Sequence, residues 1–144
     1  MDAVDVLQLD HRKIEKLFSE FQTAATPRSA ALGIIRTALL AHAQAEQQVF
    51  YPALEQWASD EVEHAIEEHQ GVEERLNELR AMDIDGEEFS PKFFELMDSV
   101  ENHIGEEEAP GGLLEVARQR LSEEQLSDLA TEVQRIKTIS EQAA

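Results

Sequence analysis

Six side chains that can bind a metal ion interrupt the apolar stripes of the chain. Apolar residues recur at steps of three and four along four long segments, and each stripe contains one histidine. Two of the stripes add a glutamate. An imidazole offers one nitrogen to a metal, whereas a carboxylate has two oxygens and can bridge two metals. The six residues are His11, His42, Glu46, His69, His103 and Glu107.

The spacing of the two glutamates places each beside a histidine. Four residues separate His42 from Glu46, and His103 from Glu107, so each pair lies on one helix face about a turn apart. Two bridging glutamates and four terminal histidines describe a dinuclear site. They supply about eight of the roughly twelve bonds that two six-coordinate ions form, which leaves room for a bridging oxygen species and an external ligand. Nitrogen and carboxylate ligands without sulfur favour iron or manganese.

The structural alternative is that these residues are ordinary core residues. A single histidine on an apolar face is usually a hydrogen-bonded core residue. Burial of a charged carboxylate without a partner, however, costs several kcal/mol, against a total stability of roughly 5–15 kcal/mol for a domain. Two such carboxylates beside four imidazoles therefore favour a metal, whose positive charge compensates for the burial.

Helical periodicity dominates the 144 residues, and no convincing run of alternating β-branched residues is present. The length indicates one domain, residues 1–144. We expect an all-α fold: an antiparallel up-and-down four-helix bundle with an additional C-terminal helix packed against it. The predicted helices cover residues 4–24, 27–49, 60–81, 90–108 and 122–141, with a short helical piece through Trp57 and a loop over 82–88.

Local signals define several helix ends. In Thr26-Pro27 we expect an N-cap followed by the first helical position. Tyr51-Pro52 interrupts the second helix, because the residue before proline avoids helical angles. Pro110-Gly111-Gly112 ends the fourth helix. The last helix begins with a capping-box pattern, Ser122-x-x-Gln125.

Short motifs surround the six residues. In chain order they are Leu9-Asp10-His11, His42-Ala43-Gln44-Ala45-Glu46, Phe50-Tyr51-Pro52-Ala53-Leu54, Glu68-His69, His103-Ile104-Gly105-Glu106-Glu107 and Leu121-Ser122-Glu123-Glu124-Gln125-Leu126. Over nearly the whole chain this sequence resembles the hemerythrin-like, or HHE cation-binding, domains of the bacterial single-domain type. The resemblance implies a four-helix bundle with two iron ions, a non-haem di-iron centre bridged by an oxo or hydroxo group. It also implies that the four histidines are terminal ligands and that Glu46 and Glu107 bridge.

The third helix differs from that family. The oxygen-carrying hemerythrins have two histidines four residues apart there, whereas the residue four before His69 is Ala65. His64 is the nearest substitute, but it lies roughly 120° from the middle of the stripe, and only a bulge would swing it inward. A missing fifth histidine leaves an additional open position, which argues against simple reversible oxygen carriage. The short stretch after Glu107 also predicts an open rim on that side of the site.

Other side chains are weaker candidates. Glu73 follows a candidate histidine by four residues, and we expect it at the surface or behind a ligand. Tyr51 is expected to pack in the core, with contact to the metal pocket only if Pro52 bends the chain. Solvated helix faces are expected to carry the neighbouring acids Glu67, Glu68, Glu106 and Glu108.

Acidic residues outnumber basic ones by 31 to 12, for a formal charge of −19 with histidine neutral. Such a surface repels phosphate backbones and anionic lipids, so nucleic-acid and membrane partners are disfavoured. The absence of cysteine excludes a thiol nucleophile, a disulfide framework and a thiolate-held cluster. The acidic N-terminus does not resemble a signal peptide, and no apolar stretch is long enough to span a bilayer. We therefore expect a cytoplasmic protein.

The leading functional hypothesis is a non-haem di-iron protein that binds or reacts with dioxygen, peroxide or nitric oxide, and we favour binding or sensing over catalysis. The same centre could instead serve iron homeostasis, or catalyse peroxide disproportionation, ferroxidase or nitric-oxide chemistry. A ferritin-like protein would need paired Glu-x-x-His motifs, and only Glu61-x-x-His64 fits, away from the main stripe. A helical interaction module remains as the alternative without metal.

Overall fold

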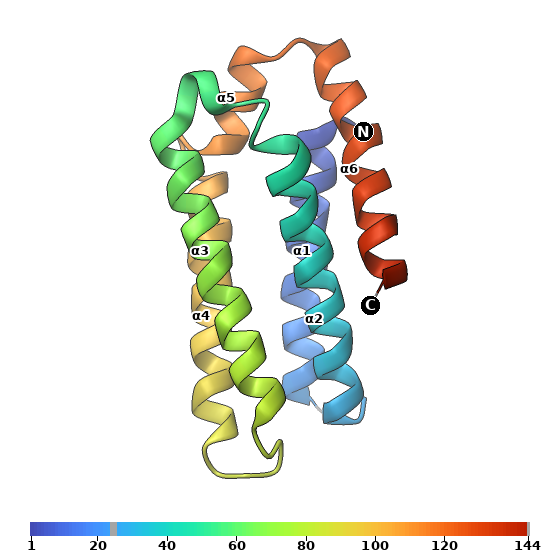
Figure 1. Ribbon diagram of the computed structural model, residues 1–144, viewed down its shortest axis with the longest axis vertical. Coiled ribbons are helices and arrows are strands. Elements are labelled where there is room, and N and C mark those ends of the chain that lie inside the picture. The colour runs from blue at the N-terminus through green and yellow to red at the C-terminus, as the bar shows by residue number, and fades with distance from the viewer. Residues whose placement is uncertain (24–25, 144) are drawn as a thin grey trace.

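Four long antiparallel helices form the body of the protein (Figure 1), seen in a computed structural model that describes residues 1–23 and 26–143. They are α1 (Ala3–Thr23), α2 (Arg28–Ala45), α3 (Glu55–Ala81) and α4 (Phe89–Glu108), followed by α5 (Leu113–Arg120) and α6 (Glu123–Ala143). The predicted all-α bundle with a C-terminal helix is confirmed. Within the described residues, none of the helices combines the length and apolar character that a bilayer crossing requires.

Helix α6 packs against α1 and α2 on the outside of the bundle (Figure 1). The capping box predicted at its start is present: Gln125 N donates to Ser122 Oγ over 3.1 Å, and Ser122 N donates to Gln125 Oε1 over 2.8 Å. On its inner side α6 buries Leu126, Ala130 and Val133. The C-terminal helix is therefore an integral layer of the fold.

Helix α5 is absent from the sequence prediction. Its eight residues make little more than two turns, too few for an apolar period to be recognised. Its inner side buries Leu113 and Leu114. Its Arg118 forms ion pairs of 2.7 and 2.9 Å with Asp2 and Asp5 at the start of α1. The helix thus closes the end of the bundle at which α1 begins.

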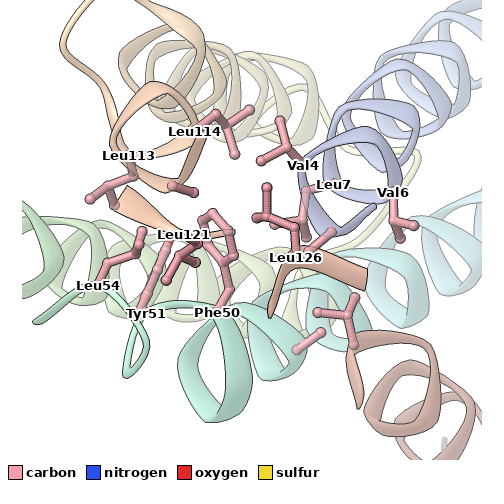
Figure 2. Packing of buried hydrophobic residues seen from close by; sticks show 14 of the residues in the cluster. Val4, Val6, Leu7, Phe50, Tyr51, Leu54, Leu113, Leu114, Leu121 and Leu126 are labelled. Atoms are coloured by element: carbon pink, nitrogen blue, oxygen red, sulfur yellow. The ribbon is translucent and has the colours of Figure 1, made fainter. Parts of the chain in front are cut away.

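Two apolar clusters fill the two ends of the bundle. The α5-side cluster includes Val4, Leu7, Phe50, Tyr51, Leu54, Leu113, Leu114 and Leu126 (Figure 2). The loop-side cluster includes Ile14, Phe18, Phe21, Ile35, Leu79, Phe89, Phe93 and Leu96. Along α1, α2 and α3 the candidate histidine separates residues of one cluster from residues of the other. The candidate ligands therefore lie at the junction of the two clusters.

The connection between α2 and α3 departs from the predicted boundaries. Helix α2 changes at Glu46 into a π-helical turn, η1 (Glu46–Phe50). A turn over residues 51–54 follows. Helix α3 then starts at Glu55, before the predicted start at residue 60, and contains a backbone break at Ala58 (φ −146°, ψ 44°). Apolar periodicity predicts neither the π-helical turn nor the break at Ala58, because both change the backbone without a change in the residue types.

Other predicted boundaries lie within one or two residues of the observed ones. Helix α4 starts at Phe89 instead of Ser90. Pro27, rather than Thr26, is the N-cap of α2, since its ψ of 135° is extended although the ring fixes φ near a helical value. The predicted end of the first helix at residue 24 lies outside the described residues.

The end of α4 is a tight turn that requires glycine. A Cβ atom on Gly112 would lie 2.3 Å from the carbonyl oxygen of Glu106 and 2.6 Å from that of Glu107. The chain therefore folds directly over the end of the helix. Gly111 adopts a φ of 80°, a left-handed conformation that glycine tolerates. The helix stop predicted at Pro110-Gly111-Gly112 is confirmed.

We expect Gly112→Ala to destabilise the protein, because the added methyl group would overlap backbone carbonyls and the turn would have to open. The free energy of unfolding in urea should fall by about 2 kcal/mol or more. Gly33→Ala is the matched control, since a Cβ at Gly33 in α2 meets nothing within 4 Å and should stabilise the helix by about 0.5–1 kcal/mol. Equal effects at the two positions would contradict the tight turn.

Candidate metal centre

The structure brings the six predicted residues together inside the bundle, in a set that we call the buried centre. The set consists of His11 from α1, His42 from α2, Glu46 from η1, His69 from α3, and His103 and Glu107 from α4. Their exposed fractions lie between 0% and 8%. Their binding of metal stays a prediction, which the measurements described below test.

The donor atoms fall into two groups that share one glutamate. Atoms of His11, His42, Glu46 and Glu107 lie within 4.8 Å of one another in the first group, and atoms of Glu46, His69 and His103 do so in the second. Glu46 Oε1 lies 3.2 Å from Nε2 of His42 in the first group. The same oxygen lies 3.0 Å from Nε2 of His69 in the second group. Glu46 thus faces both groups, as a bridging carboxylate must.

Glu107 also faces both groups, with one oxygen toward each. Its Oε1 lies 3.2 Å from His11 Nε2, and its Oε2 lies 3.4 Å from His103 Nε2. The two glutamates come from different elements, η1 and α4, so the packing of the bundle sets their separation. The bridging roles that the resemblance implies for Glu46 and Glu107 fit this arrangement.

Four buried atoms of the centre have no hydrogen-bond partner among the described residues. They are His11 Nε2, His42 Nε2, Glu46 Oε2 and Glu107 Oε1. Their residues are the members of the first donor group. Buried polar atoms are rarely left unsatisfied, because each costs about 1–3 kcal/mol. A cation among these atoms would satisfy all four, so the donor set fits a metal ion.

Each histidine is held by an oxygen acceptor on its outer side. The Nδ1 atom of His11 lies 2.6 Å from Glu108 Oε2, and that of His42 lies 2.9 Å from Asp10 Oδ2. The Nδ1 atom of His69 lies 2.8 Å from Gln47 Oε1, and that of His103 lies 2.9 Å from Glu68 Oε1. Since all four acceptors are oxygens, every Nδ1 carries a proton and donates it. In the neutral form of each ring the lone pair is then on Nε2, which faces the other donors of the centre.

Asp10 extends one of these contacts to the C-terminal helix. Its Oδ1 pairs with Lys137 of α6, and the two side chains are only 10% and 13% exposed. Burial alone would raise the pKa of Asp10, but hydrogen bonds and charges from His42 and Lys137 lower it. The anionic carboxylate accepts a hydrogen bond from His42 Nδ1 and so fixes the orientation of that ring.

The hydroxyl of Tyr51 lies in the middle of the centre. It donates to Glu107 Oε2 over 2.5 Å and lies 3.1 Å from Glu46 Oε1. Nε2 of His69 and Nε2 of His103 are each 3.3 Å away. Burial and the charges of the two carboxylates raise the pKa of Tyr51 well above its ordinary value, so the phenol keeps its proton.

The π-helical turn explains why the expectation of core packing for Tyr51 is incomplete. The ring does pack in the α5-side cluster (Figure 2). In η1, however, Tyr51 N donates to Glu46 O, five residues earlier, over 2.7 Å. The extra residue per turn rotates Tyr51 relative to an α-helical continuation and directs its hydroxyl inward. The only indication in the sequence is Pro52, which predicts that the helix is interrupted but does not predict a π-helical turn.

Two acids expected on solvated faces lie against the centre instead. Glu68 and Glu108 accept the Nδ1 protons of His103 and His11, and the prediction was wrong for both. A glutamate placed about 100° away from the inward face of a helix is long enough to reach the edge of a ligand ring. Helical angle alone therefore does not identify these outer partners.

The remaining candidates lie at the surface, as the sequence predicts. The side chain of His64 is 59% exposed and that of Glu106 is 52% exposed. Glu73 is exposed on α3. Ala65, the residue four before His69, is buried, so its methyl group occupies the place where a fifth histidine would start.

The carboxylates hold two histidines in the charged form when no metal is bound. Burial would lower the pKa of His42, but the charges of Glu46 and Asp10 outweigh it and raise that pKa to about 10. Burial is likewise outweighed at His103, where Glu46 and Glu107 raise the pKa to about 10. The ordinary pKa of histidine is 6.5. The contacts of the two charged imidazoles therefore contribute fully to the stability of the metal-free fold below pH 6.5, and this contribution is lost as the pH rises through 10.

Metal binding at pH 7 should release about two protons per chain, because His42 and His103 must lose a proton before Nε2 can bind. Calorimetric titration of the metal-free protein with Fe²⁺ under nitrogen, in buffers of different ionisation enthalpy, measures this number. The release should disappear above pH 10, where both imidazoles are already neutral. Binding heats that do not depend on the buffer at pH 7 would contradict the charged state.

We expect Tyr51→Phe to reduce the stability of the metal-free protein by about 1–3 kcal/mol, since Glu46 and Glu107 lose a buried donor while the ring packing is retained. The measurement is urea unfolding of both proteins with and without metal. Metal gives the carboxylates another partner, so the loss should become smaller when metal is bound. The same loss in both states would show that metal does not replace the hydrogen bonds of the hydroxyl.

Known proteins are similar to this chain in sequence. Residues 2–110 match the Hemerythrin HHE cation binding domain, and this range contains all six residues of the buried centre. An uncharacterized hemerythrin-like protein of Schizosaccharomyces pombe is 30% identical over 139 residues, which cover 92% of this chain and 68% of that protein. A Nostoc sp. protein named DNA nickase is 30% identical over 141 residues, or 96% of this chain. The chain spans only 40% of the length of that relative.

A solved structure shares the fold. The crystal structure of a hemerythrin HHE cation binding domain-containing protein from Mycobacterium kansasii superimposes with a TM-score of 0.84, covering 99% of this chain and 89% of that chain. The two sequences are 19% identical, so this likeness concerns the fold. The domain match extends over most of the chain and includes the residues that meet in the bundle. The chain belongs to the hemerythrin HHE cation-binding domain family.

Proposed function

We propose that this is a non-haem di-iron protein that binds or reacts with dioxygen, peroxide or nitric oxide. The observation that carries the proposal is the pair of donor groups, which share Glu46 and contain four unsatisfied buried atoms. His11 and His42 would hold one iron, and His69 and His103 the other, with the carboxylates between them. Iron held there supplies electrons by changing between the ferrous and ferric states, the chemistry that these small oxidants require.

A small cavity beside the centre suits a ligand of this size. Its volume is about 90 Å³, roughly three times the share of one water molecule in the liquid. The four histidines line it together with Ile14, Leu39, Val72, Leu76, Val100 and Ile104. Three exposed polar side chains, Gln44, Gln47 and Glu73, also line it. The apolar side chains limit the size of the molecule that can approach the centre.

The residues around the cavity hold protons at defined atoms. The outer acceptors keep one proton on Nδ1 of every histidine, so Nε2 is the atom that remains for metal. Tyr51 Oη holds a proton between Glu46 and Glu107. This hydroxyl can turn from one carboxylate to the other when the charge of the centre changes.

Two alternative functions use the same centre. Ala65 provides no fifth imidazole, and the additional open position favours a di-iron oxidoreductase acting on peroxide, ferrous iron or nitric oxide. Iron homeostasis or sensing is favoured by the four unsatisfied atoms, because iron would then change the stability of the fold, a change that a partner can detect. We favour a binding or sensing role over catalysis.

The proposed ligand is a diatomic molecule or peroxide in a cytoplasmic protein, with no nucleic-acid or membrane partner. A formal charge of −19 opposes binding to phosphate backbones.

Reconstitution with ferrous iron under nitrogen should give about two irons per chain and an optical spectrum that changes in air and in peroxide. His42→Ala, Glu46→Ala and Glu107→Ala should each lose iron, because each removes a donor of the first group. His64→Ala is the control and, after desalting to remove weakly bound ions, should retain the same iron content as wild type, since His64 lies outside the buried centre. Metal analysis together with optical spectra provides the measurement.

Three results would revise the proposal. Wild-type protein without stoichiometric iron would end it, and loss of iron from His64→Ala would overturn the four-histidine assignment. Steady peroxide turnover that Glu46→Ala abolishes would favour the enzyme. Limited proteolysis that differs with and without iron would favour the sensor.

A further inference from the structure

A second group of metal-binding side chains lies at the surface, next to the buried centre. His64 and Glu68 are one turn apart on α3, and Glu106 faces them from α4. His64 Nε2 lies 3.2 Å from Glu106 Oε2 and 3.6 Å from Glu68 Oε2. Donor atoms of the three residues lie within 4.8 Å of one another. Since His64 and Glu106 are more than half exposed, an ion in solvent can reach them.

Glu68 connects this surface group to the buried centre. Its Oε1 accepts the proton of His103 Nδ1 over 2.9 Å, whereas its Oε2 faces His64. One carboxylate therefore contacts a candidate ligand of the centre and a surface imidazole at the same time. The two groups of donors are neighbours, separated by a single side chain.

An open pocket of about 420 Å³ includes residues of both groups. His64, Glu68 and Glu106 line it, and so do His103 and Glu107. The last two are only 5% and 2% exposed. The oxygen of Glu107 that has no hydrogen-bond partner, Oε1, faces His11 inside the buried centre. The wall of the pocket thus extends from the exposed donors to two residues of the buried centre.

The charge of the pocket is negative. Asp60 and Glu61 add two carboxylates to those of Glu68 and Glu106, and among the described residues on its wall there is no lysine or arginine. A concave surface with charges of one sign raises the local concentration of counter-ions and speeds their association roughly 10- to 1000-fold. One imidazole and two carboxylates form a donor set that Fe²⁺, Mn²⁺ and Zn²⁺ accept.

We propose that His64, Glu68 and Glu106 form a surface site for a divalent cation, and that metal reaches the buried centre through it. The loading role rests on the function proposed above, whereas the surface site does not. The six residues of the buried centre are at most 8% exposed, so an arriving ion needs an intermediate position. Three donors, two of them on side chains that are more than half exposed, bind an ion weakly enough to release it inward, toward His103 and Glu107 on the same wall.

The double variant His64→Gln, Glu106→Gln tests both parts. It removes the imidazole and one carboxylate at exposed positions and leaves Glu68, which holds His103, in place. Glu141→Gln is the control for charge, because Glu141 is an exposed carboxylate on α6, outside the pocket. Circular dichroism and urea unfolding should show that all three proteins are equally folded.

Mn²⁺ binding tests the surface site. In a titration of metal-free protein, followed by the electron paramagnetic resonance signal of free Mn²⁺, wild type and Glu141→Gln should bind one Mn²⁺ per chain more than the double variant. Equal numbers in all three proteins would overturn the site. The three side chains would then form only a network of contacts among themselves.

The rate of iron uptake tests the loading role. After rapid mixing with Fe²⁺ under nitrogen and quenching with a ferrous chelator, the double variant should fill about tenfold more slowly than wild type and reach the same final iron content. Equal rates would overturn the loading role. Wild-type protein that takes up no iron would refute the proposed function and the loading role together, while the Mn²⁺ count would still decide the surface site.

Discussion

The burial of two carboxylates among four imidazoles is the interaction on which the rest of the structure depends. In the metal-free protein, protonated His42 and His103 balance the charges of Glu46 and Glu107. The balance is incomplete, because four buried atoms still have no partner. A stable fold tolerates such a centre only if the surrounding packing is strong or a cation completes the set of contacts.

The packing around the centre is arranged to hold the donors apart. The α5-side and loop-side clusters lie on either side of it, and the donors come from four helices and one π-turn. Their separation is therefore set by apolar contacts that do not involve the donors themselves. The tight turn at Gly112 contributes by bringing α5 across the end of the bundle, directly after the helix that carries His103 and Glu107. Such a preformed arrangement is what a metal site requires of its scaffold.

The sequence was sufficient to predict the bundle and the meeting of the six polar residues, because steps of three and four report which side chains share a helix face. It did not predict the inward position of the Tyr51 hydroxyl, since a π-turn leaves no periodic trace. It also misplaced Glu68 and Glu108. The reach of a long, flexible side chain depends on how close the neighbouring helix is, and that distance is a property of the packed bundle.

Through Lys137, the C-terminal helix influences the buried centre although it contributes none of the six donor residues. This lysine lies beyond residues 2–110, which carry the domain match, yet it pairs with the aspartate that holds His42. The charge of Lys137 changes the strength of the hydrogen bond that Asp10 accepts from His42 Nδ1. That hydrogen bond in turn affects the basicity of His42 Nε2. Proteins with the same six donors but a different last helix would accordingly differ in how strongly these donors hold a cation. A substitution in the last helix can therefore change the properties of the buried centre without a change in the residues that form it.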